Sequence, residues 1–366
     1  MQRIILSLII IALIAYSGFF FFKSLKDKVR QDFSRPVPYP TITKTEAPTH
    51  LSTLKTAETQ SLFVPYWTLK EQASAPVYDQ YIYFGIVPTK SGIDLKEQGS
   101  LNLEHFSAFV PDHKKKLLAV RMIDPDTNFA ILNDAGKQKE LIDQAIMLAR
   151  DNKFDGIVLD LEVSAIPFDS LIKQINQFTE NFYTTIKQQK LTFEVAVYGD
   201  VFYRVRPFDI KTLAKNSDQL LVMAYDFSKA KGDPGPNFPL KGAENYGYDY
   251  TKMTEDFLRV VPPEKIVVVF GLFGYDWVVD NQGKTLEAGQ AITLQEAKSK
   301  FIDACKERSC AYSRDGKSIE MEVKYEDHNG IKHIIWFEDQ DSVAAKKTYL
   351  KQSGINNFSY WAYSYF

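Results

Sequence analysis

Short apolar runs alternate with longer amphipathic stretches from Ser61 to the end of this 366-residue chain. Apolar runs without regular alternation are typical of strands that are buried on both faces. The runs predict eight strands, at residues 62–69, 80–87, 117–123, 156–162, 192–198, 220–225, 266–272 and 358–362. Helical patterns, such as those at residues 137–152 and 170–189, lie between them.

Regular alternation of strands and helices predicts an α/β fold of the (β/α)8 TIM-barrel type over residues 61–366. A doubly wound sheet is the main alternative, but no glycine-rich phosphate loop follows any predicted strand. In such a barrel the residues that perform chemistry lie at the C-terminal ends of the strands. The strand ends are therefore the place to look for a site.

The alternation stops between about residues 278 and 335. A helical pattern at residues 294–308 precedes two apolar runs at 320–325 and 332–337, and these runs are joined across Asn329-Gly330. Asn-Gly is a strong signal for a hairpin turn. We interpret this segment as a small α+β insertion between strands seven and eight that forms one wall of the cleft.

An apolar run at residues 4–22 has the length of one membrane span. A cleaved signal peptide is the alternative, although the run is long for one and Phe19 to Phe22 make a poor cleavage site. We expect a transmembrane helix over residues 1–23 and a flexible stalk, rich in Thr, Pro and Lys, over residues 24–60. Basic residues after the run favour a barrel on the cytoplasmic side of the membrane, but long domains cross membranes regardless of charge.

Two carboxylates, Asp160 and Glu162, stand at the end of the fourth predicted strand. Residues two apart on a strand point to the same face. Neighbouring carboxylates cannot both ionise freely, so one should keep its proton to higher pH, as a general acid must. The simpler alternative is that they cap the next helix or pair with a lysine.

The other predicted strand ends carry large aromatic and acidic residues. These are Tyr66 and Trp67, Met223, Tyr225 and Asp226, Tyr275 and Trp277, and Trp361. Aromatic rings stack on sugar faces, and carboxylates perform the acid–base steps of glycoside cleavage. For the tryptophans and Met223 ordinary core packing is the alternative, and for Asp226 it is a helix cap.

Composition narrows the choice. The net charge of −2 gives no sign of nucleic-acid binding. The five histidines show no metal-ligand spacing, so we expect neither a catalytic metal nor a cofactor. Cys305 and Cys310 form a local disulfide if this region is extracytoplasmic, and two free thiols are the alternative.

The chain resembles glycoside hydrolase family 18, the chitinase-like barrels. The family pattern DGxDxDxE is matched by Asp155, Gly156, Asp160 and Glu162, whereas Val158 replaces its second aspartate. The pattern M-x-Y-D is matched by Met223, Tyr225 and Asp226, the run with Tyr275 and Trp277 is similar to that of strand seven, and Trp361 falls where the family has the tryptophan under the −1 sugar. The segment Trp336-Phe337-Glu338-Asp339 with Tyr360-Trp361 looks most like the bacterial spore-cortex and cell-wall N-acetylglucosaminidases.

The resemblance implies substrate-assisted retention. Glu162 would act as acid and then base, Asp160 would orient the substrate's 2-acetamido group, and Tyr225 would bind its carbonyl oxygen. Asp226, Trp361, Tyr66, Tyr275, Trp277 and Met223 would contact substrate. Asp155 and Gly156 would be structural.

We therefore expect a monomeric, membrane-anchored glycosidase that cleaves β-1,4 bonds in polysaccharides containing N-acetylglucosamine, in peptidoglycan rather than chitin. Because that substrate lies outside, we expect the barrel on the extracytoplasmic side of the cell membrane. A catalytically inactive glycan-binding module is the alternative, because Val158 departs from the family pattern. A tethered interaction scaffold is a third interpretation, which no residue specifically supports.

Overall fold

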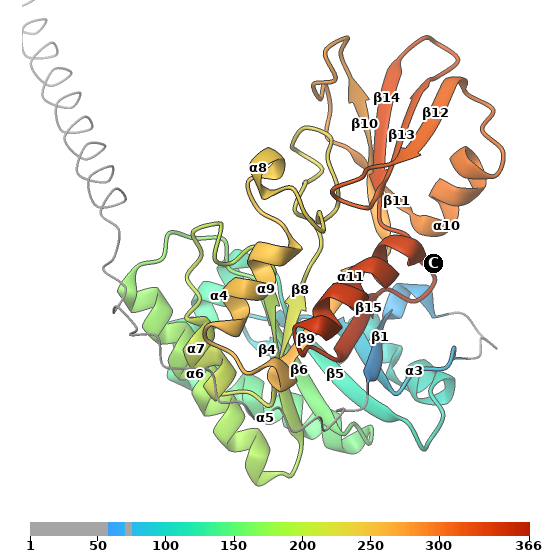
Figure 1. Cartoon of the computed structure of the whole chain (residues 1–366). Coiled ribbons are helices and arrows are strands. Elements are labelled where there is room, and N and C mark those ends of the chain that lie inside the picture. The colour runs from blue at the N-terminus through green and yellow to red at the C-terminus, as the bar shows by residue number, and fades with distance from the viewer. Residues whose placement is uncertain (1–57, 70–74) are drawn as a thin grey trace, which may run out of the picture. The chain divides into compact units, whose positions relative to one another are not determined.

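Eight parallel strands close into a barrel in the computed structural model, which describes residues 58–69 and 75–366 (Figure 1). In order around the barrel the strands are β1 (Thr59–Pro65), β15 (Asn357–Trp361), β9 (Ile266–Gly271), β8 (Gln219–Met223), β7 (Thr192–Tyr198), β6 (Gly156–Leu161), β5 (Lys115–Met122) and β2 (Gln80–Ile86). The predicted (β/α)8 fold is confirmed. The strand β1 begins two residues before the predicted start of the barrel and ends at Pro65, after which the 3-10 helix η1 (Tyr66–Thr68) begins.

Helices follow most strands and cover the outside of the barrel (Figure 1). They are α2 (Gln98–Leu101), α3 (Leu103–Phe109), α4 (Pro125–Leu132), α5 (Ala135–Asp151), α6 (Asp169–Gln188), α7 (Ile210–Lys215), α9 (Tyr250–Leu258), the 3-10 helix η2 (Pro263–Lys265) and α11 (Gln340–Gln352). The short helix α8 (Ala243–Tyr246) lies instead beyond the strand ends, on the side of the insertion (Figure 1). A short hairpin of β3 (Pro88–Thr89) and β4 (Gly92–Ile93) follows β2.

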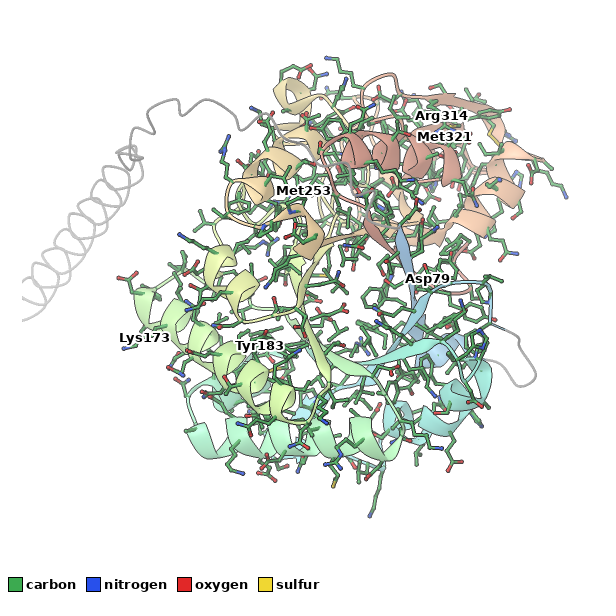
Figure 2. All side chains as sticks on the ribbon, turned by 60° about the horizontal axis from the view of Figure 1, so that its bottom comes forward. Asp79, Lys173, Tyr183, Met253, Arg314 and Met321 are labelled. Carbon is green, nitrogen blue, oxygen red and sulfur yellow. A yellow bond between two sulfur atoms is a disulfide. The ribbon has the colours of Figure 1, made fainter. Side chains whose placement is uncertain are left out.

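The helix α6 illustrates how the sequence pattern produces this layer. Ile175, Phe182 and Ile186 recur at helical spacing and are fully buried, whereas Lys173 lies on the exposed side (Figure 2). The helix α5 begins at an N-cap, Asp134, whose carboxylate accepts hydrogen bonds from two backbone amides of the first turn. Both helices lie within two residues of their predicted bounds.

Side chains that point into the barrel form a second, separate core. Its buried members are Phe63, Ile82, Phe84, Leu117, Ala119, Val158, Ala196, Leu221, Val267, Val269 and Ala362. Successive residues of a strand alternate between the two cores, so Ile157 and Leu159 pack outward while Val158 and Asp160 point inward. The inward side of β6 therefore carries an apolar residue directly below Asp160.

The insertion is a five-stranded antiparallel sheet, drawn in orange in Figure 1. Its strands, in sheet order, are β11 (Gln290–Thr293), β10 (Phe273–Val279), β14 (Lys332–Phe337), β13 (Met321–Glu326) and β12 (Arg308–Arg314). The predicted hairpin is confirmed, with Gly330 at positive φ in its turn. The insertion begins earlier than predicted, because β10 already pairs with β14 at Gly274.

The predicted helix at residues 294–308 is wrong beyond residue 302. The helix α10 (Leu294–Ala297) continues only as the π-helix η3 (Lys298–Ile302), and Arg308 begins a strand that pairs with β13. A disulfide between Cys305 and Cys310 closes the connecting turn. The disulfide and the pairing of β12 with β13 replace the predicted helix in this segment. The pairing joins Arg308 to Glu326, which is distant in the chain, so the local sequence pattern could not predict it.

A buried ion cluster joins the insertion to the barrel. Lys346 of α11 lies between Glu320 and Glu338, and all three side chains are inaccessible to solvent. Glu320 also accepts hydrogen bonds from the backbone amides of Asn237 and Phe238, which belong to the segment that follows β8. The cluster therefore holds in place the segment that follows Asp226.

The predicted membrane anchor and nearly all of the predicted stalk lie outside the described residues. Within residues 58–69 and 75–366, no helix is long and apolar enough to cross a membrane.

Candidate active site

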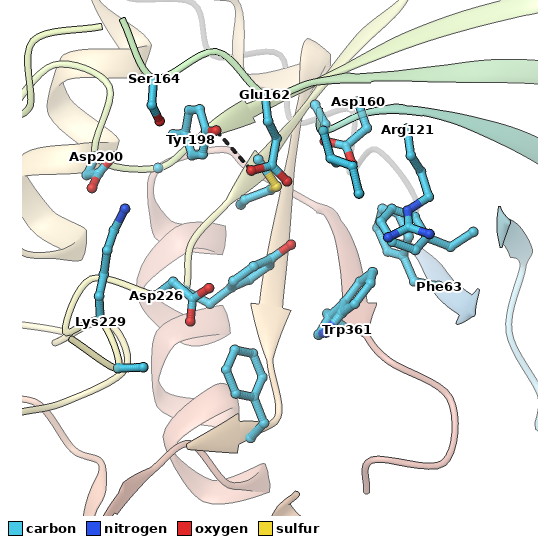
Figure 3. Close-up of a pocket in the computed structure, with 18 of the residues that line it drawn as sticks. Phe63, Arg121, Asp160, Glu162, Ser164, Tyr198, Asp200, Asp226, Lys229 and Trp361 are labelled. Atoms are coloured by element: carbon cyan, nitrogen blue, oxygen red, sulfur yellow. Dashed lines mark hydrogen bonds between the residues drawn. The ribbon is translucent and has the colours of Figure 1, made fainter. Parts of the chain in front are cut away.

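A cavity of about 620 Å³ opens at the C-terminal ends of the barrel strands (Figure 3). Strands from all sides of the barrel contribute to its wall. The side chains that the argument uses are Phe63, Trp67, Phe84, Arg121, Asp160, Glu162, Tyr198, Asp200, Arg206, Met223, Tyr225, Asp226, Lys229, Tyr275 and Trp361. Carboxylates, basic groups and aromatic rings thus meet around one space.

The cavity contains both members of the predicted carboxylate pair. Asp160 is the last inward-facing residue of β6 and is 3% exposed, whereas Glu162 follows the strand and is half-buried. The hydroxyl of Tyr198 donates a hydrogen bond to Oε2 of Glu162 at 3.0 Å, drawn as a dashed line in Figure 3. The backbone amide of Glu162 donates to the carbonyl of Met122. These two contacts fix the position of the more accessible carboxylate.

Asp160 is the buried member of the pair, and its surroundings oppose its ionisation. Burial raises the pKa of Asp160 to about 7, the charge of Glu162 adds to the rise, and the nearby Arg121 guanidinium opposes it. The Oδ1 atom of Asp160 is buried and has no hydrogen-bond partner among the described residues. A buried polar atom without a partner is costly, and here it faces a cavity in which a ligand N–H could pair with it.

Tyr225 and Asp226 follow β8 and face the carboxylates. Burial and the charge of Asp160 raise the pKa of the Tyr225 phenol well above its usual value, so Tyr225 is a neutral hydrogen-bond donor. Asp226 has a φ of 57°, a turn that aspartate tolerates, and its amide donates to Asn237 Oδ1 at 2.7 Å. Tyr275 donates to Oδ1 of Asp226 at 2.8 Å, while burial raises the pKa of Asp226.

Aromatic rings form the floor of the cavity around Trp361. The indole ring lies 4.6 Å from the ring of Phe84 and 5.5 Å from that of Phe63, and at 6.4 Å it stacks with the ring of Tyr225 at an angle of 29°. These contacts hold the indole rigidly while part of it stays accessible. A rigid aromatic face beside two carboxylates suits the apolar face of a sugar ring.

Arg121 is a site residue that the sequence analysis missed. It is the register partner of Asp160 across β5 and β6, and its guanidinium lies 4.0 Å above the Phe84 ring and 5.3 Å from that of Trp67. Its Nε atom is buried without a partner among the described residues. A charged residue within the apolar run of a predicted barrel strand was a signal that could have identified it.

A second missed group surrounds Tyr198, at the end of β7. The Arg206 guanidinium lies 3.6 Å from the centre of the Tyr198 ring, and Arg206 and Arg204 both bind Asp200. Applying the strand-end rule to the fifth predicted strand would have identified Tyr198 and Asp200.

Two predicted substrate contacts lie elsewhere. Trp277 is fully buried, and its indole N–H donates to the carbonyl of Ala230 at 3.0 Å while the ring packs with Trp336. Tyr66 does not line the cavity, but its neighbour Trp67 does. For Trp277 the packing interpretation is the better one, and the ring of Tyr66 packs against that of Trp67.

Asp155 and Gly156 lie at the opposite end of the barrel from the cavity. Asp155 accepts a hydrogen bond from the Lys116 amide at 2.8 Å and so ties β6 to β5. A side chain at Gly156 would meet Thr192 Oγ1 at 2.0 Å. Both residues are structural. In the described part of the chain, no group of three or more His, Cys, Asp or Glu side chains is arranged to hold a metal ion.

The sequence model of Glycosyl hydrolases family 18 matches residues 63–365, which include the whole cavity. The chain belongs to this family. The name of the family is that of glycosidases, the enzyme class that the strand-end residues predicted. The family match also confirms the resemblance on which the site residues were assigned.

The names of similar proteins are consistent with this family. The cortical fragment-lytic enzyme of Bacillus cereus is 27% identical over 241 residues, which are 64% of this chain and 52% of that protein. The chain spans about half the length of the relatives it matches first.

Solved structures share the fold. The Bacillus cereus spore cortex-lytic enzyme SleL has a TM-score of 0.67 at 19% identity, covering 84% of this chain and 71% of that one. The family 18 chitinase of Cycas revoluta, in complex with (GlcNAc)3, has a TM-score of 0.71 at 20% identity, covering 83% and 94%.

Proposed function

We propose that this protein is a retaining glycosidase that cleaves β-1,4 bonds in polymers containing N-acetylglucosamine. The observation that carries the proposal is the meeting of Asp160, Glu162 and Tyr225 beside Trp361 in one cavity. Glu162 is the more accessible carboxylate and Tyr198 fixes its position, so we assign to it the protonation of the glycosidic oxygen. Asp160, whose pKa burial raises to about 7, takes part as an anion above that pH.

The nucleophile is the acetamido oxygen of the substrate, which attacks the anomeric carbon as the leaving sugar departs. Asp160 accepts the acetamido N–H on its unpaired Oδ1 and, as an anion, stabilises the positive charge of the resulting oxazolinium ion. Tyr225 donates to the acetamido oxygen. Glu162, now ionised, takes a proton from a water molecule that attacks the anomeric carbon. This attack opens the oxazolinium ring and restores the acetamido group.

The remaining cavity residues position the sugar. Trp361 offers its indole face to the ring whose bond is broken, and Met223 lies beside it in the wall. Asp226 and Tyr275 are joined by a hydrogen bond and present polar groups toward the substrate hydroxyls. The sugar in this position must carry a 2-acetamido group, because without one there is no nucleophile.

We infer that peptidoglycan, rather than chitin, supplies this sugar. The names of several relatives describe lysis of cortical fragments, which favours a cell-wall glycan. We also propose that residues 4–22 anchor the chain in the cell membrane with the barrel on the outer side. The disulfide between Cys305 and Cys310 supports an oxidising, extracytoplasmic environment.

The proposal is tested with the full-length protein and its Glu162→Gln variant. Each is incubated with purified peptidoglycan and with N-acetylglucosamine oligomers, and new reducing ends are identified by mass spectrometry. Cleavage by the unmodified protein alone supports the glycosidase, and the reducing-end sugar identifies the bond. Retention of glycan by both proteins without cleavage would favour a glycan-binding module, with the apolar Val158 below Asp160 as the cause.

Membrane anchoring is tested separately. Full-length protein should sediment with membranes and resist extraction by high salt, and its barrel should be digested by protease added outside the cell. Recovery of a shortened chain in the medium would indicate a cleaved signal peptide instead.

A further inference from the structure

The two ends of the cavity differ in composition. At one end Phe63 and Trp361 supply apolar surface beside the pair of Arg121 and Asp160. Asp200 and Lys229 lie at the other end, with Glu162 between the two groups (Figure 3). The Lys229 end contains four cations, of which Arg206, Lys229 and Lys231 line the cavity and Arg204 lies on Asp200. Asp200 is the carboxylate of this end, and Asp226 lies between it and Tyr275, so this end has a surplus of positive charge.

Asp200 is already occupied by two arginines. Its Oδ2 lies 2.6 Å from Arg204 Nη1, and its Oδ1 lies 2.7 Å from Arg206 Nη2. Arg206 is itself only 6% exposed at its side chain and is held against the Tyr198 ring. These two cations are fixed in the wall and are satisfied within the protein.

Lys229 is different. It forms no ion pair with any residue of the described chain, and neither does Lys231. Burial lowers the pKa of the Lys229 ammonium, and the charges of Arg206 and Arg204 lower it further. Both lysines line the cavity and are accessible to solvent, so an anion that enters the cavity can reach them.

The proposed reaction indicates which part of the substrate meets this end. Asp160, Tyr225 and Trp361 hold the sugar whose anomeric carbon reacts, and Glu162 protonates the oxygen that joins it to the leaving sugar. From Glu162 a continuous series of contacts runs through Tyr198 and Arg206 to Asp200, away from the Trp361 floor. In the proposed reaction the leaving sugar, joined through the oxygen at Glu162, therefore extends toward the cationic end.

We propose that Lys229, assisted by Lys231, binds a carboxylate carried by the leaving sugar, as N-acetylmuramic acid carries one. This inference rests on the proposed glycosidase function and specifies its substrate: a glycan in which an anionic unit follows the reacting N-acetylglucosamine. A carboxylate–ammonium hydrogen bond in a partly buried cavity is stronger than a neutral one. An uncharged chitin strand offers only neutral oxygen acceptors, whose hydrogen bonds to an ammonium group are weaker.

The kinetic test compares full-length protein with Lys229→Ala and Lys229→Arg. The substrates are N-acetylglucosamine oligomers, muramic-acid glycan strands freed of stem peptide by an amidase, the same strands with their carboxyls converted to neutral amides, and strands with intact stem peptide. For Lys229→Ala the loss of kcat/KM should be at least about tenfold larger on a carboxylate-bearing glycan than on the neutral ones, and Lys229→Arg should restore most of it. Lys252→Ala, on an exposed face of α9, is the matched control.

The free-acid and stem-peptide arms distinguish the two sources of the carboxylate. A preference for the free-acid strands assigns it to the sugar, and a preference limited to intact strands assigns it to the peptide and overturns the proposal. Equal losses on charged and neutral glycans would also overturn it.

A binding measurement separates this inference from the proposed reaction. In the Glu162→Gln background, the Kd for free-acid strands should rise about tenfold on adding Lys229→Ala and should depend on salt, while the Kd for neutral oligomers changes far less. Failure of the unmodified protein to cleave any glycan would refute the proposed function, yet the Kd comparison would still decide whether Lys229 binds the anion. An unchanged Kd for the charged strands refutes the inference.

Discussion

Arg121 and Asp160 are neighbours in register on β5 and β6, and both point into the same cavity. Below Asp160 the barrel is filled with apolar side chains, including Val158. The family pattern has an aspartate at the position of Val158, directly below Asp160. In this chain no carboxylate stands there, and the charged neighbour of Asp160 on the next strand is Arg121. Arg121 opposes the effect of burial on the pKa of Asp160.

Replacement of Arg121 by methionine should therefore raise the pKa of Asp160 further above about 7. If ionised Asp160 stabilises the oxazolinium ion, the acidic limb of the kcat profile should move upward by about one pH unit. The measurement is kcat against pH on N-acetylglucosamine oligomers. Arg259→Met, which removes an exposed arginine from the end of α9, should leave the profile in place. A limb that stays where it was would show that Arg121 does not control Asp160.

Replacement of Val158 by aspartate inserts a carboxyl into the apolar core below Asp160. Like charges at short range disfavour ionisation, so the acidic limb should again move to higher pH. The new carboxyl has no partner among its buried neighbours, and we expect a loss of about 1–3 kcal/mol in unfolding free energy. The pH profile and urea denaturation check the two effects separately. An unchanged profile in a destabilised protein would show that the site does not use this position.

Replacement of Tyr198 by phenylalanine removes the hydroxyl that donates to Glu162 at 3.0 Å. Without it the carboxyl of Glu162 is held less firmly, so kcat should fall about tenfold, which is less than the roughly hundredfold cost of a misplaced or missing acid. The ring, and with it the Arg206 contact, is retained. Tyr246→Phe removes a similar hydroxyl from Asp315 on the insertion and is the matched control. Equal activity of the two variants would contradict a positioning role for Tyr198.

The barrel and the acidic centre of the site were predictable because their signals are local. Parallel strands buried on both faces read as apolar runs, and the two-residue spacing of Asp160 and Glu162 already puts them on one face. The pair formed by Arg121 and Asp160 was not visible in the same way. It depends on the register between β5 and β6, which no single run contains.

Trp277 was predicted to contact substrate, but the structure buries it away from the cavity. Tyr275 and Trp277 lie two residues apart on β10 and point to the same face of that strand, so the pattern treats them alike. Tyr275 reaches the cavity, whereas Trp277 is covered by Ala230 and Gly289. Ala230 and Gly289 lie 47 and 12 residues from Trp277 in the chain, so only the tertiary structure shows that they bury its ring.

The stability of the site depends on the buried cluster of Lys346, Glu320 and Glu338. Replacement of Lys346 by methionine leaves two inaccessible carboxyls without their cation, and breaking such a group costs about 3–5 kcal/mol. Urea denaturation of the full-length protein should show a loss of this order. Lys347→Met removes a partly accessible lysine from the same helix and should cost far less. Equal midpoints for the two variants would show that the cluster is not a stabilising contact.

The same cluster predicts how stability depends on pH. Burial raises the pKa of Glu338 to about 8, whereas in the unfolded chain this group ionises near its ordinary value of 4.5. Between these two values the folded state binds more protons than the unfolded state, so the unfolding free energy should fall as pH rises toward about 8. Glu338→Gln keeps the shape of the side chain, removes the titration and should flatten this slope. Denaturation midpoints of both proteins, measured from pH 5 to pH 9, test the prediction. Parallel slopes in the two proteins would assign the pH dependence to another group, such as Asp160 or Glu194, whose pKa values burial also raises.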